Sequence, residues 1–368
     1  MNLPEYKTLS EKKEYFVSYQ IDDWESLKQI IDQYYEDSKE ISIEDVSAPE
    51  EEVDYNILPT DSDSEAIQKI IIKDQERHAK RKTIPIFRGM HAAKYKLYTS
   101  SQRYWVKNSL SSKYSNIDEF IKKQIDFAKS YQNNLLENFY SAFNHKAYDL
   151  SILGFLQHYG AGTPILDWSH RFNSALFFAF DGLSSSYDDQ EDGLEKYVSV
   201  YMIDLGKSHL NIPNLIAHIN KSTSDIDAII KKYKNLNPNH SSVTSKIEML
   251  DYSYFSSLKL FYMPGYLEGG QKFLIEEIPD FEVIYNQHNL NIIAQKGCFM
   301  FNNSSDKPLE EMFLGPNNDW DLKKITCYNV HKNLETQVRQ YLDKININKA
   351  FMFPEEEKIA KIALNKSL

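Results

Sequence analysis

A stretch in the middle of the chain, residues 153–169, sets the strongest limit on the fold. It begins with a helical pattern, and Gly160, Gly162 and Pro164 then prevent the helix from continuing. The apolar run 175–180 follows. A polar turn between two core elements is a place where a rigid scaffold presents functional side chains. We therefore expect residues 153–169 to carry part of a functional site.

A second segment, residues 84–90, has the sequence Ile-Pro-Ile-Phe-Arg-Gly-Met. Its apolar residues predict a strand, and Arg88 stands near the end of that strand. We interpret residues 84–90 and 153–169 as the two halves of one site.

Elsewhere, helical and strand patterns mix without strict alternation, which favours an α+β fold over a doubly wound sheet. Strands are predicted at residues 15–19, 84–88, 197–203, 273–277, 291–295 and 298–301. Helices are predicted at residues 22–35, 66–81, 112–143 and 149–158, and in the tail 333–368, where Pro354 separates two of them.

Charge divides the chain unevenly. Residues 36–65 contain twelve acidic residues and one lysine. The net charge of this segment is therefore −11, the same as that of the whole chain. The remainder is neutral overall, so it has no global basic field to attract nucleic acid, although a local basic groove remains possible. We expect four parts: an N-terminal strand–helix segment 1–35, an acidic linker or loop 36–65, a core 66–320 and a C-terminal helical extension 321–368.

Several classes of protein are disfavoured by missing patterns. The sequence lacks the glycine-rich dinucleotide and P-loop motifs, the zinc-protease motif and the hydrolase nucleophile motif. Two cysteines without a paired motif argue against a disulfide framework or structural zinc site. No apolar run approaches the length of about 18 residues that a membrane span needs. We expect no membrane partner and a cytoplasmic setting.

The segments Ile86–Gly89 and Leu156–Ser169 resemble the FRG domain family, named for its Phe-Arg-Gly signature. Similar family features follow in order at 95–103, 175–179, 291–299 and 350–354. The resemblance spans about residues 84–365 and makes residues 66–320 the FRG core. One departure is Gly162-Thr-Pro-Ile, where the family usually has Pro-Thr-Arg-Leu.

The same segments are similar to arginine-type ADP-ribosyltransferases. Ile86–Gly89 is similar to their first signature, and 166–179 is similar in spacing to their second. This similarity implies a mixed or antiparallel split β-sheet core with flanking helices, and NAD as the substrate. Their third signature is a glutamate that opens a late strand. Here Asn291 and Gln295 stand in its place, and Glu276, Glu277 and Glu282 lie upstream.

Cleavage of NAD needs a cation for the pyrophosphate, a planar group for the nicotinamide and support for an oxocarbenium-like state. Arg88 is the candidate pyrophosphate ligand, or else a buried partner of Asp167. His158 could bind a ribose hydroxyl or cap a helix, and Asp167 could orient His158 or Arg88. Gln295 could bind the ribose or pair within a strand.

The remaining candidates line the same predicted pocket. Gly89 allows close approach of a ligand or forms a turn, and Trp168 and Tyr159 either stack on a base or belong to the core. Ser169 is the remaining pocket candidate. A hydrolase triad of Ser169, His158 and Asp167 is disfavoured because the three residues are too close in sequence.

The leading hypothesis is an ADP-ribosyltransferase-like enzyme that cleaves NAD with Arg88, His158 and Gln295. The acceptor would be water or a macromolecule, protein or nucleic acid, and the family resemblance suggests a bacterial toxin or phage-defence effector. The alternative is a non-catalytic module that binds a nucleotide or a nucleic-acid end on the same fold. A third hypothesis is an interaction protein whose acidic stretch 36–65 docks a basic partner.

Overall fold

The computed structural model describes residues 3–37, 85–142, 147, 149–183, 193–204, 260–264, 290–302, 304–312 and 325–367. Most of the acidic stretch 36–65 lies outside these ranges. The same is true of the predicted helix 66–81 and the predicted strand 273–277.

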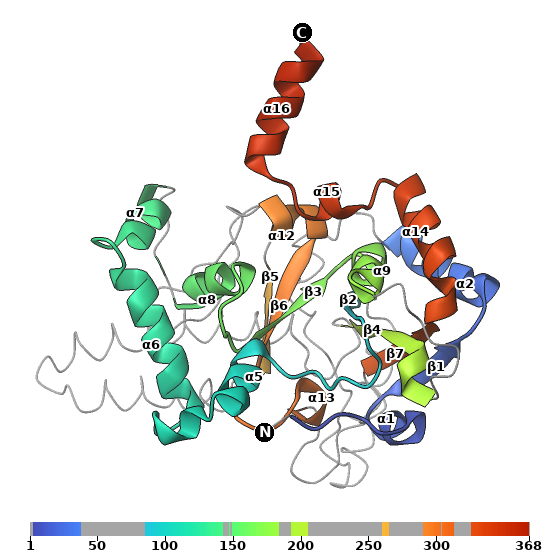
Figure 1. Ribbon diagram of the computed structural model, residues 1–368, viewed down its shortest axis with the longest axis horizontal. Helices are drawn as coiled ribbons and strands as arrows, with labels where there is room; N and C mark the ends of the chain where they lie inside the picture. The colour runs from blue at the N-terminus through green and yellow to red at the C-terminus, as the bar shows by residue number, and fades with distance from the viewer. Residues whose placement is uncertain are drawn as a thin grey trace, which may run out of the picture.

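The core is one seven-stranded sheet within the described ranges. Its strands are β1 (Val17–Ile21), β2 (Pro85–Met90), β3 (Ile165–Ser169), β4 (Tyr197–Asp204), β5 (Leu260–Pro264), β6 (Gly297–Asn302) and β7 (Ile325–His331). The strand order is β1-β7-β4-β2-β3-β6-β5, and only β1 and β7 pair in parallel. The sheet is mixed and flanked by helices, so the predicted α+β class is confirmed (Figure 1).

The sheet is nearly divided between β2 and β3. These two strands share a single registered pair, Phe87 with Ser169. On either side the ladders are longer, since β2 pairs with β4 along Pro85–Met90 and β3 pairs with β6 along Ile165–Ser169. Beyond the single pair the two halves of the sheet separate, and their backbone groups are open to side chains.

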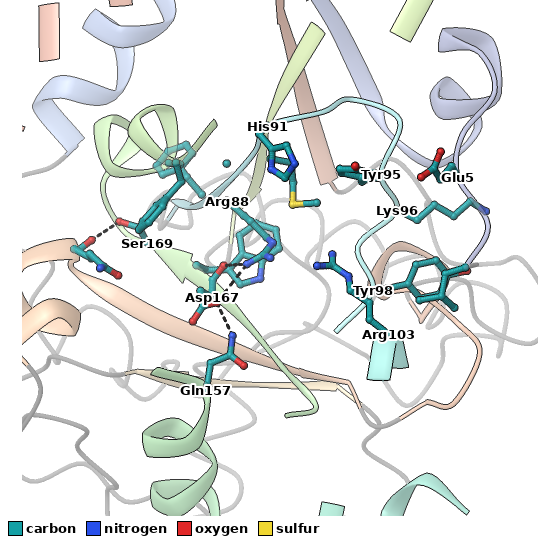
Figure 2. Close-up of a pocket in the computed structure, with 18 of the residues that line it drawn as sticks. Glu5, Arg88, His91, Tyr95, Lys96, Tyr98, Arg103, Gln157, Asp167 and Ser169 are labelled. Atoms are coloured by element: carbon teal, nitrogen blue, oxygen red, sulfur yellow. Dashed lines mark hydrogen bonds and ion pairs between the residues drawn. The ribbon is translucent and has the colours of Figure 1, made fainter. Parts of the chain in front are cut away.

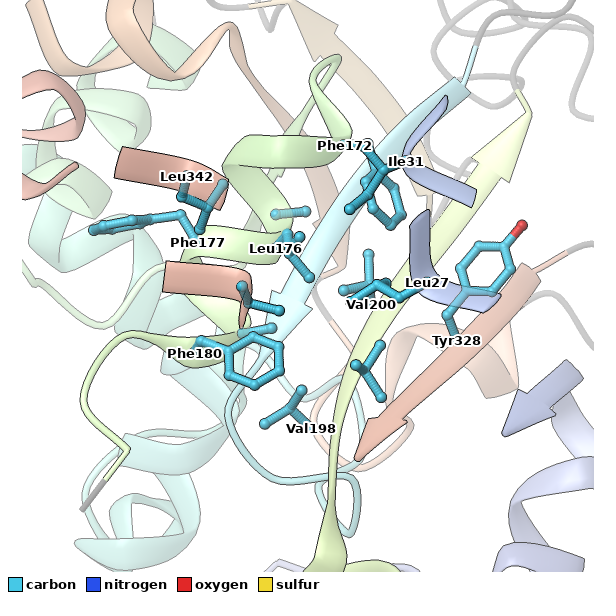
Figure 3. Close-up of a cluster of buried hydrophobic side chains, with 14 of the residues drawn as sticks. Leu27, Ile31, Phe172, Leu176, Phe177, Phe180, Val198, Val200, Tyr328 and Leu342 are labelled. Carbon is cyan, nitrogen blue, oxygen red and sulfur yellow. The ribbon is translucent and has the colours of Figure 1, made fainter. Parts of the chain in front are cut away.

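One face of the sheet is covered by α9 (Phe172–Phe180), with α2 (Trp24–Asp37) and α14 (Glu335–Lys344) beside it. All residues of α9 except Phe178 are buried, which explains why the run is apolar on every side. Figure 3 shows Leu176 and Phe180 of α9 among Val198 and Val200 of β4 and Leu27 of α2.

Gly89 permits this close packing. A Cβ atom at Gly89 would lie 1.9 Å from the carbonyl oxygen of Ala175 and 2.6 Å from the amide nitrogen of Ala179. Glycine is therefore required at position 89 because the backbone of α9 packs directly against β2 there. The sequence had suggested two other reasons, the close approach of a ligand or a turn.

The other face carries a second apolar cluster that includes Leu166, Trp168 and Met300. The N-terminal helix α1 (Leu9–Tyr15) is joined to this part of the fold by Lys12. The buried Lys12 Nζ donates to the carbonyl oxygen of Ala93 at 2.9 Å, Ser199 Oγ at 2.7 Å and Asn329 Oδ1 at 3.0 Å. Three acceptors satisfy this buried ammonium group.

A third cluster packs helices against Ile165 of β3 and Phe299 of β6. These helices are α5 (Ser100–Lys107), α6 (Ile117–Ser130), α7 (Leu135–Ala142) and α8 (Asp149–His158). The single helical region predicted at 112–143 is wrong, because Gln132, Asn133 and Asn134 have φ of 43°, 58° and 61° and break it.

Two local predictions in the site region are also wrong. Residues 165–169 form β3 and not a turn, so Asp167, Trp168 and Ser169 lie on a strand. Residues 291–295 belong to a helix, α12 (Leu290–Gln295). Ile292 of α12 is buried in the third cluster, and the left-handed φ of 47° at Lys296 ends the helix before β6.

The two ends of the described chain meet in the sheet. β1 belongs to the expected N-terminal segment, and β7, on which it pairs, lies in residues 321–368, expected to be helical. The tail also contains α15 (Lys349–Met352) and α16 (Glu356–Ser367), and α13 (Leu309–Met312) precedes it. Short 3₁₀ helices occupy Leu110–Ser112, Gly193–Lys196 and Lys332–Leu334. The division into four parts stays a prediction.

Candidate functional site

A cavity of about 840 Å³ opens where β2 and β3 separate. Its walls come from the N-terminal residues 3–5, β2, α5, the end of α8, β3 and α9. Figure 2 shows side chains from these elements converging on it. Seven predicted site residues line the cavity: Arg88, Gly89, His158, Asp167, Trp168, Ser169 and Gln295. The eighth, Tyr159, is 70% exposed and lines a different, apolar cavity between α6, α7 and α8.

Arg88 extends into the opening between the two strands. Its Nη1 donates to the main-chain carbonyl oxygen of Asp167 at 2.5 Å and lies 3.9 Å from Oδ2 of the same residue. The guanidinium therefore donates a hydrogen bond to a main-chain carbonyl that would pair with β2 if the ladder between β2 and β3 were continuous. Its Nε is buried and has no hydrogen-bond partner. A buried donor without an acceptor is costly, so a hydrogen bond from this atom to an acceptor would be stabilising.

Arg88 stays charged in this position. Burial lowers the pKa of Arg88 to about 10, the negative charge of Asp167 opposes that shift, and the positive charge of Arg103 adds to it. At neutral pH the guanidinium is protonated. Arg88 was alternatively expected to be a buried partner of Asp167, and this expectation is confirmed in part. The ion pair between the two side chains is long, at 3.9 Å, and the short contact is with the main-chain carbonyl of Asp167.

Asp167 is positioned by Gln157. Gln157 Nε2 donates to Asp167 Oδ2 at 2.7 Å. Gln157 Oε1 in turn accepts from Thr163 Oγ1 and, at 3.4 Å, from Ser100 Oγ. The relay fixes one carboxylate oxygen, while the Asp167 side chain remains half exposed to the cavity.

His158 is the last residue of α8, where Gly160 with a φ of +80° permits the chain to turn. Its Nε2 lies 2.6 Å from Nδ2 of Asn291 on α12. Because an amide nitrogen only donates, Nε2 accepts and the proton of the neutral ring is on Nδ1. Burial lowers the pKa of His158 below its ordinary value, and Asp167 partly offsets this effect. His158 is therefore neutral at physiological pH.

Ser169 and Gln295 are engaged with the backbone. Ser169 Oγ donates to the carbonyl oxygen of Gln295 at 2.6 Å and accepts from the amide of Arg171 at 2.9 Å. Gln295 Nε2 donates to the carbonyl oxygen of Met352 at 2.9 Å. The expected strand pairing of Gln295 is wrong, since the residue ends α12. These contacts join β3, α12 and α15 behind the cavity.

Residues 83–188 match the family model of the FRG domain. This chain contains an FRG domain. The match runs from β2 to the residues after α9 and thus includes Arg88, Gln157, His158 and Asp167. No curated protein and no solved structure matches the chain.

Trp168 of the FRG domain borders the cavity without offering its ring to it. The side chain is 3% exposed and belongs to the cluster with Leu166 and Met300. Its buried Nε1 has no hydrogen-bond partner. The half-buried rings of Phe178 and Phe353, whose centroids are 6.0 Å apart, line the same cavity and are more open to a planar ligand.

Basic side chains on one side of the cavity in the FRG domain were not predicted from the sequence. Arg103 and Lys107 of α5 line the cavity with His91 and Lys96, and in Figure 2 Arg103 and Arg88 point toward the same space. The family-like segment 95–103 ends at Arg103, so spacing on a predicted helix, with Lys107 four residues later, was an available signal.

Candidate metal sites and candidate membrane spans were both absent from the described residues. Within them, no group of three or more His, Cys, Asp or Glu side chains lies where it could hold a metal ion. None of their helices combines the length and apolar composition needed to cross a membrane.

Proposed function

We propose that the FRG domain binds NAD in the cavity between β2 and β3 and cleaves its nicotinamide–ribose bond. The observation that carries the proposal is Arg88, a charged guanidinium whose buried Nε has no acceptor and which lines a cavity of about 840 Å³. A guanidinium in this state is suited to a phosphate oxygen, which accepts from two of its N–H groups at once. Small-molecule and cofactor pockets commonly have volumes of about 300–1,000 Å³, and this cavity is within that range.

Asp167 supplies the charge that such a cleavage needs. When the bond between ribose C1′ and the nicotinamide nitrogen breaks, the electron pair leaves with nicotinamide and positive charge develops on the ribose. A carboxylate held in place by Gln157 at 2.7 Å stabilises that charge without reorganisation. Water or a group on a macromolecule then attacks C1′ and releases a proton.

The neutral His158 and the aromatic pair complete this proposal. Nδ1–H of His158 donates to a ribose hydroxyl or to the carboxamide of nicotinamide. Phe178 and Phe353 border the cavity with their rings at 80° to each other, so one of the two rings stacks on the nicotinamide, a role first expected of Trp168 and Tyr159. Gln295 contributes through its hydrogen bond to Met352, which holds α12 and α15 together behind the site.

One observation favours the alternative of a non-catalytic module for a nucleotide or nucleic-acid end. Asn291 and Gln295 occupy the place of the transferase glutamate, and both are on a helix, engaged with His158 and with the Met352 carbonyl. Glu276, Glu277 and Glu282 lie outside the described residues. Binding of NAD by calorimetry with no product would support this alternative.

The test is release of nicotinamide from NAD by the full chain, followed by chromatography with and without cell lysate as a source of acceptors. Arg88→Lys keeps the charge and loses the planar fork, so we expect a fall in release of about 100-fold. His158→Ala should also lower release. Lys113→Gln is the control, because Lys113 is exposed and lies outside the cavity lining. Undiminished release by Arg88→Lys would overturn the proposed mechanism.

A further inference from the structure

The helix α5 presents two basic side chains to the cavity and is itself held firmly. Thr99 caps its first turn through a capping box with Gln102. Gln102 Nε2 donates to the carbonyl oxygen of Lys307 at 2.8 Å, and the amide of Ser101 donates to that of Thr163 at 3.0 Å. Arg103 and Lys107, one helical turn apart, therefore project from a fixed support.

The charged groups that line the cavity are mostly paired. Lys96 lies 3.2 Å from Glu311, and Glu5 lies 3.6 Å from Lys94, which is outside the cavity lining. Arg88 has Asp167 at 3.9 Å. In the part of the chain that the structure describes, Arg103 and Lys107 line the cavity with no acidic partner. Two positive charges thus remain in a chain whose net charge is −11.

We propose that Arg103 and Lys107 form the second half of a diphosphate clamp, with Arg88 as the first half. The inference rests on the proposed function and deepens it by assigning two further residues to the diphosphate of NAD, a diester that carries two negative charges. The number of unpaired cations equals this charge, and Figure 2 shows Arg103 directed toward Arg88 across the space that the diphosphate would occupy.

The electrostatic state of the cavity supports this inference. Burial is the main cause that lowers the pKa of Arg88 and of His91, and the positive charge of Arg103 adds to both shifts. Cations that destabilise one another's charge across a cavity gain the most from a shared anion. Arg103 supplies a planar fork and Lys107 a point charge, so Arg103 should contribute more to binding.

The experiment is calorimetric titration of the full chain with ADP-ribose, which contains the diphosphate and lacks the bond to be cleaved. We expect Arg103→Gln to weaken binding by about 10- to 100-fold and Lys107→Gln by about 3- to 10-fold. Lys113→Gln, at an exposed lysine beyond α5 and outside the cavity lining, is the matched control and should change affinity less than twofold. Wild-type binding should also weaken more steeply with salt than binding by Arg103→Gln.

Adenosine, which has no phosphate, separates a clamp from a structural role. If Arg103→Gln weakens adenosine and ADP-ribose equally, or leaves ADP-ribose unaffected, or if the wild type fails to bind ADP-ribose, the clamp is refuted. Release of nicotinamide is measured on the same samples. If the wild type releases nicotinamide and Arg103→Gln binds ADP-ribose as tightly as the wild type, the clamp is refuted and the cleavage is not. If binding of ADP-ribose depends on Arg103 but no nicotinamide is released, the cleavage is refuted and the clamp is not.

Discussion

Gln157 on α8 holds Asp167 on β3 through a hydrogen bond of 2.7 Å from Nε2 to Oδ2, and its other amide atom accepts from Thr163. Gln157→Glu keeps the acceptor for Thr163 and replaces the donor by a second carboxylate. Repulsion then turns Asp167 away, so we expect release of nicotinamide to fall about 10-fold or more.

Comparison of Gln157→Glu with Gln157→Leu, by kinetics and thermal unfolding, checks this prediction. Both variants should lose activity, with Gln157→Glu regaining part of it as the pH is lowered, because the introduced carboxyl group then takes up a proton and can donate it to the Asp167 carboxylate. Activity of Gln157→Glu equal to that of the wild type would contradict the positioning role.

Gly89→Ala should destabilise the fold severely. Its Cβ would meet the backbone of α9 at 1.9 Å, and neither a strand in mid-sheet nor a buried helix moves cheaply. We expect a loss of about 3 kcal/mol or more in the free energy of unfolding, measured by denaturant titration. Gly193→Ala is the comparison: it has a φ of +63° and open space around it, so it should cost about 1–2 kcal/mol. If the two substitutions lowered the free energy of unfolding equally, α9 would have to move away from β2 at little cost.

His170 should make stability fall in acid. Burial, and then the nearby charge of Lys296, lower the pKa of His170 from 6.5 to about 3 in the folded protein. Between these two pH values the unfolded chain binds a proton that the folded protein does not. The free energy of unfolding therefore decreases as the pH falls, by about 1.4 kcal/mol per pH unit from this group.

His170→Gln removes that contribution. Unfolding curves measured from pH 7 to pH 4 should show a smaller loss of stability for the variant than for the wild type. Parallel curves for the two proteins would mean that His170 does not remain neutral when folded.

Trp168→Phe should leave ligand affinity within about threefold of the wild type, because the ring is 3% exposed and packs in the core. Phe353→Ala should instead weaken binding of NAD by about 5- to 10-fold, since stacking on an aromatic side chain contributes about 1–3 kcal/mol. Calorimetry with NAD checks both variants. The reverse order of effects would restore Trp168 as the stacking residue.

The helix Asp149–His158 was predictable because its signals are local: an apolar pattern, then Gly160 in a left-handed conformation. The strand β4 was predictable from alternation for the same reason. Residues 291–295 misled the prediction because paired isoleucines favour a strand, whereas burial of Ile292 against β6 and the flanking helices selects a helix.

The sequence by itself determined which groups gather at the site, since seven of its eight predicted residues line one cavity. Only the tertiary structure decided how those groups are used. The single pair between β2 and β3 opens the sheet, Arg88 enters the gap, and Gln157, Arg103 and Lys107 acquire their positions from α8 and α5. Local spacing encodes helices and strands, but the register that pairs Phe87 of β2 with Ser169 of β3 depends on long-range packing, here of α9 on Gly89.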